Sequence, residues 1–296
     1  MPTIPESLPF LPNLAMLWAM EPNALGSLLS NIGVWSKTIS PKVEAFGDGR
    51  GEIPLPMAIA GGVATVRLRG PMERRASFFG TVFGLASTDA VRESIRRAGD
   101  AEEVRSILLE IDSPGGSVDG LAELGDTIRS VRAKKQVIAQ VDGTAASAAY
   151  YVAAQADKIF AGRTDLVGSI GTVLTLVDAS KMFEEAGVRV IPITSGGLKA
   201  AGEFGTEVTP EQIAYLQGIV DFYFRDFVTA VAAGRKISVP EARALGTGEV
   251  FPAPEAVLNG LIDGLQSTDE TRAKLAAGRL RRNARTARAE LDLIST

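Results

Sequence analysis

Apolar segments of two kinds alternate through the middle of this chain. Val104 to Ile111 is a near-continuous apolar run, of the kind found in a strand buried on both faces. After a glycine turn, apolar residues recur at helical spacing from Val118 to Val131, and strand-like runs follow at Val137 to Val141 and Val188 to Ile193. Strands that alternate with helices form parallel sheets with helical crossovers. The sequence therefore predicts an α/β fold.

Turn residues and helix caps predict the remaining elements. Met57 to Ala60 and Val63 to Leu68 flank a glycine pair and predict a hairpin. Thr88 can cap a helix that runs to about Ala98. Thr209, Pro210 and Gln212 predict a strong helix start, with Gly234 as a plausible end. We also expect helices at residues 145–154 and 179–186 and a short strand at residues 158–161.

The sequence contains neither histidine nor cysteine. This excludes a Ser-His-Asp triad, a cysteine nucleophile, disulfides, and zinc sites built on imidazole or thiolate ligands. A general base that works near neutral pH must be a carboxylate or a desolvated lysine. No spacing of acidic residues indicates a metal site, and we expect no cofactor. The net charge of -4 disfavours nucleic acid and anionic membranes as partners.

Composition divides the chain into three expected parts. Residues 1–55 are rich in Pro, Gly, Asn and Ser and predict an N-terminal arm that either docks on a partner or covers the core. Residues 56–268 carry the strand-and-helix domain, and residues 269–296 predict an exposed helix or a disordered, charged tail. The apolar stretch Leu8 to Met20 is broken by a proline, is too short to cross a membrane and lacks a basic leader. We expect a protein that stays where it is made.

The motif Asp112-Ser113-Pro114-Gly115-Gly116 lies between an expected buried strand and an expected helix. Adjacent glycines leave backbone N–H groups unobstructed, so those of Gly115 and Gly116 could point at a developing oxyanion. The alternative is a tight turn that holds no ligand.

Ser147 lies among small residues in the segment GTAASAAYY, residues 143–151. Small neighbours leave a hydroxyl approachable, and a position near a helix start favours negative charge, as a nucleophile requires. The alternative is a small-residue helix packed against the sheet, in which this serine is incidental.

Two further segments carry candidate partners for Ser147. Lys199 ends the segment SGGLK, and a lysine can act as a general base if desolvation lowers its pKa. Ser169, in the segment VGSIGT, could donate a hydroxyl to orient that lysine. The alternatives are a solvated surface lysine and a turn serine.

Together and in this order, these motifs resemble the signal peptide peptidase A family of serine peptidases and its relatives in phage heads. The family has a buried strand that ends in DSPGG, then AAS with small residues and a tyrosine pair, then ADKI, GSIG, and SG before a lysine. The matching segments here are Asp112–Gly116, Ala145–Tyr151, Ala156–Ile159, Gly168–Gly171 and Ser195–Lys199, and Gly248–Phe251, Glu255–Ala256 and Gly260–Asp263 resemble its closing segment.

The resemblance covers about residues 57–266 and implies a serine endopeptidase that uses a Ser-Lys dyad. Ser147 would be the nucleophile, Lys199 its base and Ser169 the hydroxyl that orients the lysine. Backbone amides near Gly115 and Gly116 would form the oxyanion hole. It also implies a crotonase-like and Clp-protease-like fold of repeated strand-helix units, protein or peptide substrates, and ring-like homo-oligomers in which neighbours complete the sites.

The chain departs from the family in ways that bear on its role. Ala148 and Ala149 stand where the family often has glycine, which leaves less room for close approach of a substrate. The expected absence of a membrane anchor, the Pro-rich arm and the charged tail resemble phage relatives that cleave scaffold and capsid proteins. We expect a head-maturation protease of the host cytoplasm and prohead. The alternatives are a soluble bacterial peptidase of the family, a crotonase-like acyl-CoA enzyme and a non-catalytic head protein.

Overall fold

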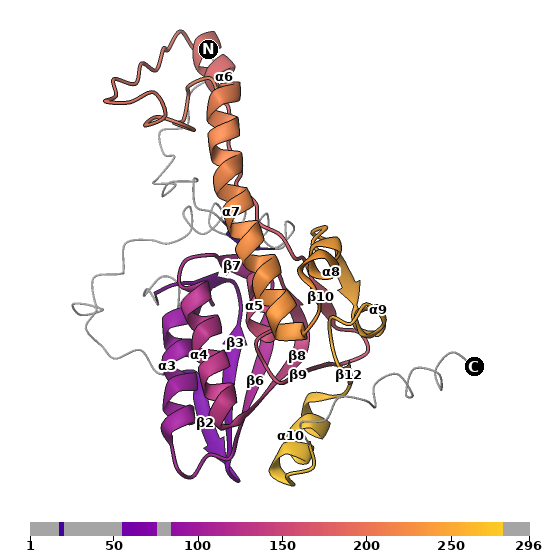
Figure 1. Ribbon diagram of the computed structural model, residues 1–296. Coiled ribbons are helices and arrows are strands. Elements are labelled where there is room, and N and C mark those ends of the chain that lie inside the picture. The colour runs from indigo at the N-terminus through magenta and orange to yellow at the C-terminus, as the bar shows by residue number, and fades with distance from the viewer. Residues whose placement is uncertain (1–17, 21–54, 76–83, 281–296) are drawn as a thin grey trace, which may run out of the picture.

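The computed structural model describes residues 18–20, 55–75 and 84–280. These residues form a large sheet, a small second sheet and helices that pack against them, and one long helix extends away from the sheets (Figure 1). No helix among these residues is both long and apolar enough to cross a membrane.

The large sheet has the order β11-β10-β8-β6-β3-β2, and β9 and β12 branch from β8. Four neighbours, β3, β6, β8 and β10, pair in parallel, whereas β2 and β11 pair antiparallel at the two ends. The parallel pairs confirm the α/β fold that the sequence predicts. The strands are β2 (Met57–Ala60), β3 (Val63–Arg69), β6 (Ser106–Ser113), β8 (Gln136–Ala146), β9 (Lys158–Ala161), β10 (Leu166–Gly168), β11 (Val250–Pro252) and β12 (Gly264–Leu265).

The small sheet has the order β1-β7-β4-β5. Its strands are β1 (Trp18–Met20), β7 (Gly115–Ser117), β4 (Met72–Glu73) and β5 (Ala86–Ser87). β7 pairs in parallel with β4 and antiparallel with β1. Only Pro114 separates β7 from the end of β6, so the chain passes directly from the large sheet into the small one at the glycine pair.

The helices begin where side chains can satisfy their first backbone N–H groups. Ser87 caps the first of them by accepting from the Ala90 N–H, one residue earlier than expected, and Thr209 forms the expected capping box with Gln212. The helices are α3 (Thr88–Asp100), α4 (Leu121–Lys134), α5 (Ala148–Ala153), α6 (Ser180–Glu185), α7 (Pro210–Arg235), α8 (Val239–Ala244), α9 (Ala253–Leu258) and α10 (Thr268–Ala276).

Most expected elements are confirmed, and two expectations need correction. The hairpin of β2 and β3 and the strand β9 lie where predicted. β8 continues to Ala146, so the helix expected from Ala145 begins three residues later. The strand expected at Val188 to Ile193 is wrong: that segment has no regular structure and finds no partner strand among the described residues.

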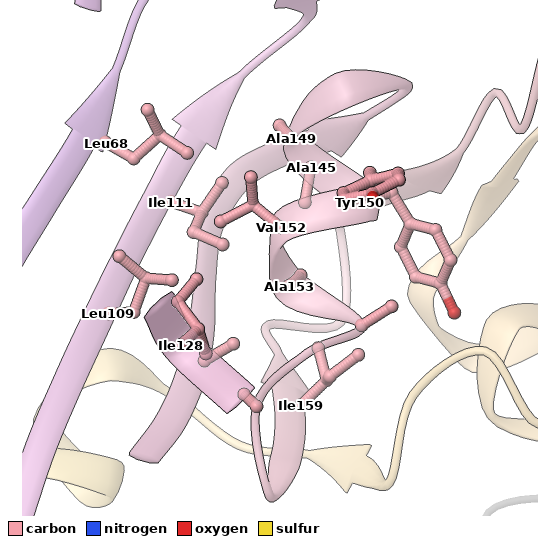
Figure 2. Close-up of a cluster of buried hydrophobic side chains, with 14 of the residues drawn as sticks. Leu68, Leu109, Ile111, Ile128, Ala145, Ala149, Tyr150, Val152, Ala153 and Ile159 are labelled. Carbon is pink, nitrogen blue, oxygen red and sulfur yellow. The ribbon is translucent and has the colours of Figure 1, made fainter. Parts of the chain in front are cut away.

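The core forms around α5, all of whose residues are buried. Figure 2 shows Ala149 and Val152 of this helix beside Leu68 of β3 and Ile111 of β6. α7 packs closely against the end of α5, since a methyl group on Gly234 of α7 would lie 2.0 Å from the carbonyl oxygen of Ala154. This close packing explains why small residues stand at the contact. Gly234 therefore permits a helix crossing, and α7 ends one residue later at Arg235, with Lys236 as its C-cap.

α10 covers the other face of the large sheet. Its Leu275 joins a buried cluster with Leu108, Ile138 and Phe160. Arg272 pairs with Glu110, a carboxylate on β6 that is only 2% exposed. The tail expected at residues 269–296 begins with a helix, as the sequence allowed, but Thr271 and Leu275 of that helix are buried rather than exposed. Residues 281–296 lie outside the described part of the chain.

Residues 173–226, which we call the projection, extend away from the sheets. In Figure 1, α6 and the loop before α7 lie at the far end of α7 from the large sheet. Of α7, only residues from Phe227 onward are buried. At 1.5 Å per residue, Pro210 to Asp226 extends about 25 Å beyond the buried part of the helix.

Candidate active site

Ser147 joins the end of β8 to the start of α5. Its backbone has φ 54° and ψ −122°, a conformation that non-glycine residues rarely adopt. The surroundings hold it there, because its N–H donates to the Gly168 carbonyl at 2.8 Å and its carbonyl accepts from the Tyr151 N–H at 2.9 Å. A serine at a strained strand-to-helix turn is the arrangement that presents a nucleophilic hydroxyl in hydrolases.

Ser169 lies beside Ser147. β10 and β8 pair in parallel with Gly168 opposite Ala146, so the two serines follow adjacent strand ends. Ser169 is also strained, with φ 51°, and its N–H donates to the Glu249 carbonyl at 2.6 Å. The fold therefore brings together two serines that lie 22 positions apart in the sequence, at the same edge of the sheet.

The glycine pair, Gly115 and Gly116, lies at the start of β7. Ser113, two residues before it, is the last residue of β6 and pairs with Ala145 of β8. Gly116 is required by packing, because a methyl group there would lie 2.1 Å from the Met72 carbonyl oxygen. Gly115 has φ 97°, and its N–H donates to the Ser113 hydroxyl at 3.2 Å. An oxyanion role for the Gly115 amide stays a prediction, and it requires that amide to give up this bond.

Lys199 does not lie near Ser147 within one chain. It belongs to a turn of the projection, its side chain is exposed, and its N–H donates to the Gly196 carbonyl at 3.0 Å. Ser147 belongs to the core around α5, at the other end of α7 (Figure 1). The desolvated surroundings that a lysine base needs are therefore absent around Lys199 in the described part of a single chain.

The tyrosine pair after Ser147 anchors α5. The Tyr150 hydroxyl donates to the Leu261 carbonyl at 2.7 Å, and the Tyr151 hydroxyl donates to Asp226 at 3.3 Å. Burial raises the pKa of both phenols well above the ordinary value. Both remain protonated near neutral pH, so neither can replace a lysine as the base.

Sequence analysis did not single out the ion pair that joins the end of α7 to β9. Arg235, only 8% exposed, pairs with Asp263 at 2.7 Å, and Asp263 also accepts the Ile159 N–H at 2.8 Å. A signal was available, because Asp263 ends the closing segment GLID. Asp263 joins the C-terminal end of α7 to β9.

The site is closed to solvent in this structure. Ser147 is 1% exposed and Ser169 is 5% exposed, and β7 is buried along its length. A substrate can reach the serine hydroxyl only if something that covers it moves.

Known families match the part of the chain that carries these residues. Residues 129–280, slightly more than half of the chain, match Peptidase family S49, and residues 74–163 match Clp protease. The first match includes Ser147, Ser169 and Lys199, and the second includes the glycine pair and Ser147.

Individual proteins match over different lengths. Protease 4 of Salmonella typhi is 28% identical over 243 residues, 82% of this chain and 38% of that protein. Capsid assembly protease C of Escherichia phage lambda is 28% identical over 213 residues, 71% of this chain and 48% of that protein. An enoyl-CoA hydratase/isomerase family structure aligns with 18% identity and a TM-score of 0.40, over 75% of this chain and 73% of that one.

The chain covers 60% or less of the length of these curated relatives and of a Synechocystis relative. The family match nevertheless takes in more than half of the chain, including both strained serines and the turn that carries the lysine. The chain belongs to peptidase family S49.

Proposed function

We propose that this protein is a serine endopeptidase in which Ser147 is the nucleophile and Lys199 of a neighbouring copy is the general base. The observation that carries the proposal is the strained turn at Ser147, which lies beside Ser169, another serine with a positive φ. Backbone strain of this kind persists only where surrounding contacts impose it, and it concentrates at active sites.

The reaction follows from these groups. The Ser147 hydroxyl attacks the carbonyl carbon of a peptide bond while the neutral lysine amine takes its proton. Backbone N–H groups of β7 stabilise the negative oxygen of the tetrahedral intermediate. The lysine then gives the proton to the departing amine, and water hydrolyses the acyl-enzyme by the same route. Ser169 would accept a hydrogen bond from the lysine and orient it.

Exposed apolar side chains support the assignment of the lysine to a neighbouring copy. Most large apolar side chains that are exposed in the described residues lie on the projection, with exposed fractions that reach 97% at Ile193 and 60% at Phe222. Monomers rarely expose so many large apolar side chains in one region. A second copy packed there would cover these side chains, desolvate Lys199 and bring it to a Ser147.

The proposed substrate is a scaffold or capsid protein of a phage head. Support comes from the lambda relative, a capsid assembly protease whose match covers 71% of this chain. Expression of the chain with the head genes of its own phage, beside the Ser147→Ala variant, tests this. Cleavage of a head protein by the wild type alone is expected, and identical head proteins in both would contradict it.

An active-site serine probe tests the nucleophile. A fluorophosphonate should label one site, and mass spectrometry should place the label on the peptide that contains Ser147. Ser147→Ala should abolish labelling, whereas Ser130→Ala, at an exposed serine of α4, should leave it unchanged. Labelling that survives in Ser147→Ala would contradict the assignment.

A further inference from the structure

The small sheet has one edge at which β7 could hold an extended peptide. A strand has two edges, and β4 occupies one of those of β7, with Met72 opposite Gly116. The other edge is occupied by β1, antiparallel, with Trp18 opposite Ser117, Ala19 opposite Gly116 and Met20 opposite Gly115. Any other strand that pairs with β7 must take the place of β1.

That edge belongs to the candidate site. Ser113 of β6 pairs with Ala145 of β8. β7 begins two residues after Ser113, and Ser147 lies two residues after Ala145, so both follow the same pair of residues. Peptides are commonly held by addition of a strand to an exposed sheet edge, where backbone hydrogen bonds fix the chain whatever its side chains. A peptide held against β7 therefore runs past the glycine pair and the proposed nucleophile.

We propose that β1 is an in-chain occupant of the peptide-binding edge of β7, which a substrate must displace. The inference rests on the proposed function for the identity of the competing ligand, a peptide. The contact between β1 and β7 does not depend on it. An occupied edge agrees with the low exposure of Ser147, at 1%, and of β7.

The contact should be easily displaced. β1 has three residues, and among the described strands it pairs with β7 alone. Two-stranded pairings of this length are marginal in water. When β1 is bound, a peptide cannot pair with β7, so the apparent affinity for peptides equals the intrinsic affinity multiplied by the fraction of molecules in which the edge is free. Turnover at high substrate concentration is unaffected.

A cysteine pair tests the contact without any need for activity. The chain has no cysteine of its own. Trp18→Cys combined with Ser117→Cys should cross-link within one chain, by disulfide formation or with a short bismaleimide, because these positions lie opposite each other. Trp18→Cys with Ala86→Cys is the control, since β5 lies three strands from β1, about 14 Å. Failure of both reagents to link the first pair would overturn the proposal.

Proline variants of the full chain test the competition. Neighbouring N–H groups of a strand point to opposite sides, so either Ala19→Pro or Met20→Pro must remove a hydrogen bond to β7. We expect that variant to lower the KM for a peptide substrate about threefold or more with kcat unchanged. Ala19→Val should keep the wild-type KM, because valine suits a strand.

The outcomes separate this proposal from the proposed function. A cross-link in a chain that hydrolyses no peptide would refute the peptidase and leave the contact between β1 and β7 in place. A cross-link together with an unchanged KM in both proline variants would show that β1 binds β7 without competing with substrate, and would overturn the inference alone.

Discussion

Among the described residues, three that are not glycine have a positive φ: Ser147, Ser169 and Lys236. Lys236 has an ordinary reason, because it ends α7 in a left-handed cap. The two serines have no such reason, and each conformation of this kind costs about 1–3 kcal/mol. Their positive φ distinguishes them from the other serines that the structure describes.

The strain at Ser147 predicts an unusual order of stabilities. Glycine adopts this backbone conformation freely, whereas alanine does not. Ser147→Gly and Ser147→Ala should both abolish peptide cleavage, and Ser147→Gly should have the higher free energy of unfolding by about 1 kcal/mol. Urea unfolding measures the difference. Equal stabilities would show that the turn stores no strain.

The lysine predicts a pH dependence. The base must be neutral to take a proton, so peptide cleavage should become faster as the pH is raised. Lys199→Met should keep the apolar stem and remove turnover, with little effect on stability.

Two other lysines serve as controls for this experiment. Lys181 is exposed on α6 of the same projection, and Lys158 begins β9. Replacement of either by Met should leave the pH profile in place. A flat profile in the wild type, or loss of activity in Lys181→Met alone, would assign the base elsewhere.

At the scale of elements, α10 closes the second face of the large sheet. Its Thr271 hydroxyl and the Gln266 side chain join Gln140 of β8 in a buried network, and Leu275 fills the apolar cluster beneath. Without α10, Glu110 and Gln140 would lose partners and Leu108 would meet water. We therefore move the proposed end of the folded domain from residue 268 to residue 280.

Two leucines test the contribution of α10. Leu275 is 4% exposed and Leu258 is 73% exposed. Leu275→Ala should lower the free energy of unfolding by about 2–4 kcal/mol, and Leu258→Ala should change it by less than about 0.5 kcal/mol. A chain that stops before Thr268 should fail to unfold cooperatively. Comparable losses for both leucines would place α10 off the sheet.

Local signals predicted most elements and could not predict what depends on distant partners. The capping box at Thr209 depends only on residues 209–212, and it is confirmed. Val188 to Ile193 has the composition of a strand, but no neighbouring strand pairs with it in the described chain. Leu275 lies in an otherwise polar helix, and its burial depends on apolar residues more than a hundred positions earlier. The pairing of Ser147 with Ser169 follows from strand order and was visible only as a family resemblance.

At the scale of the whole molecule, a single chain carries the proposed nucleophile and the proposed base at opposite ends of α7. Ser147 is buried beside the large sheet, while Lys199 is exposed on the projection. An assembly of several copies would resolve both features, because the contact that covers the projection would also complete the site. The central claim is therefore that each site draws its serine and its lysine from different chains.

Mixing two inactive variants tests this claim most directly. Ser147→Ala retains the lysine and Lys199→Met retains the serine, and neither should cleave peptide alone. After the two are dissociated and reassembled in equal amounts, about a quarter of the sites should pair an intact serine with an intact lysine in a closed ring, and activity should return to about that fraction of wild type. No recovery in the mixed assembly, with full activity in a reassembled wild-type control, would contradict the account.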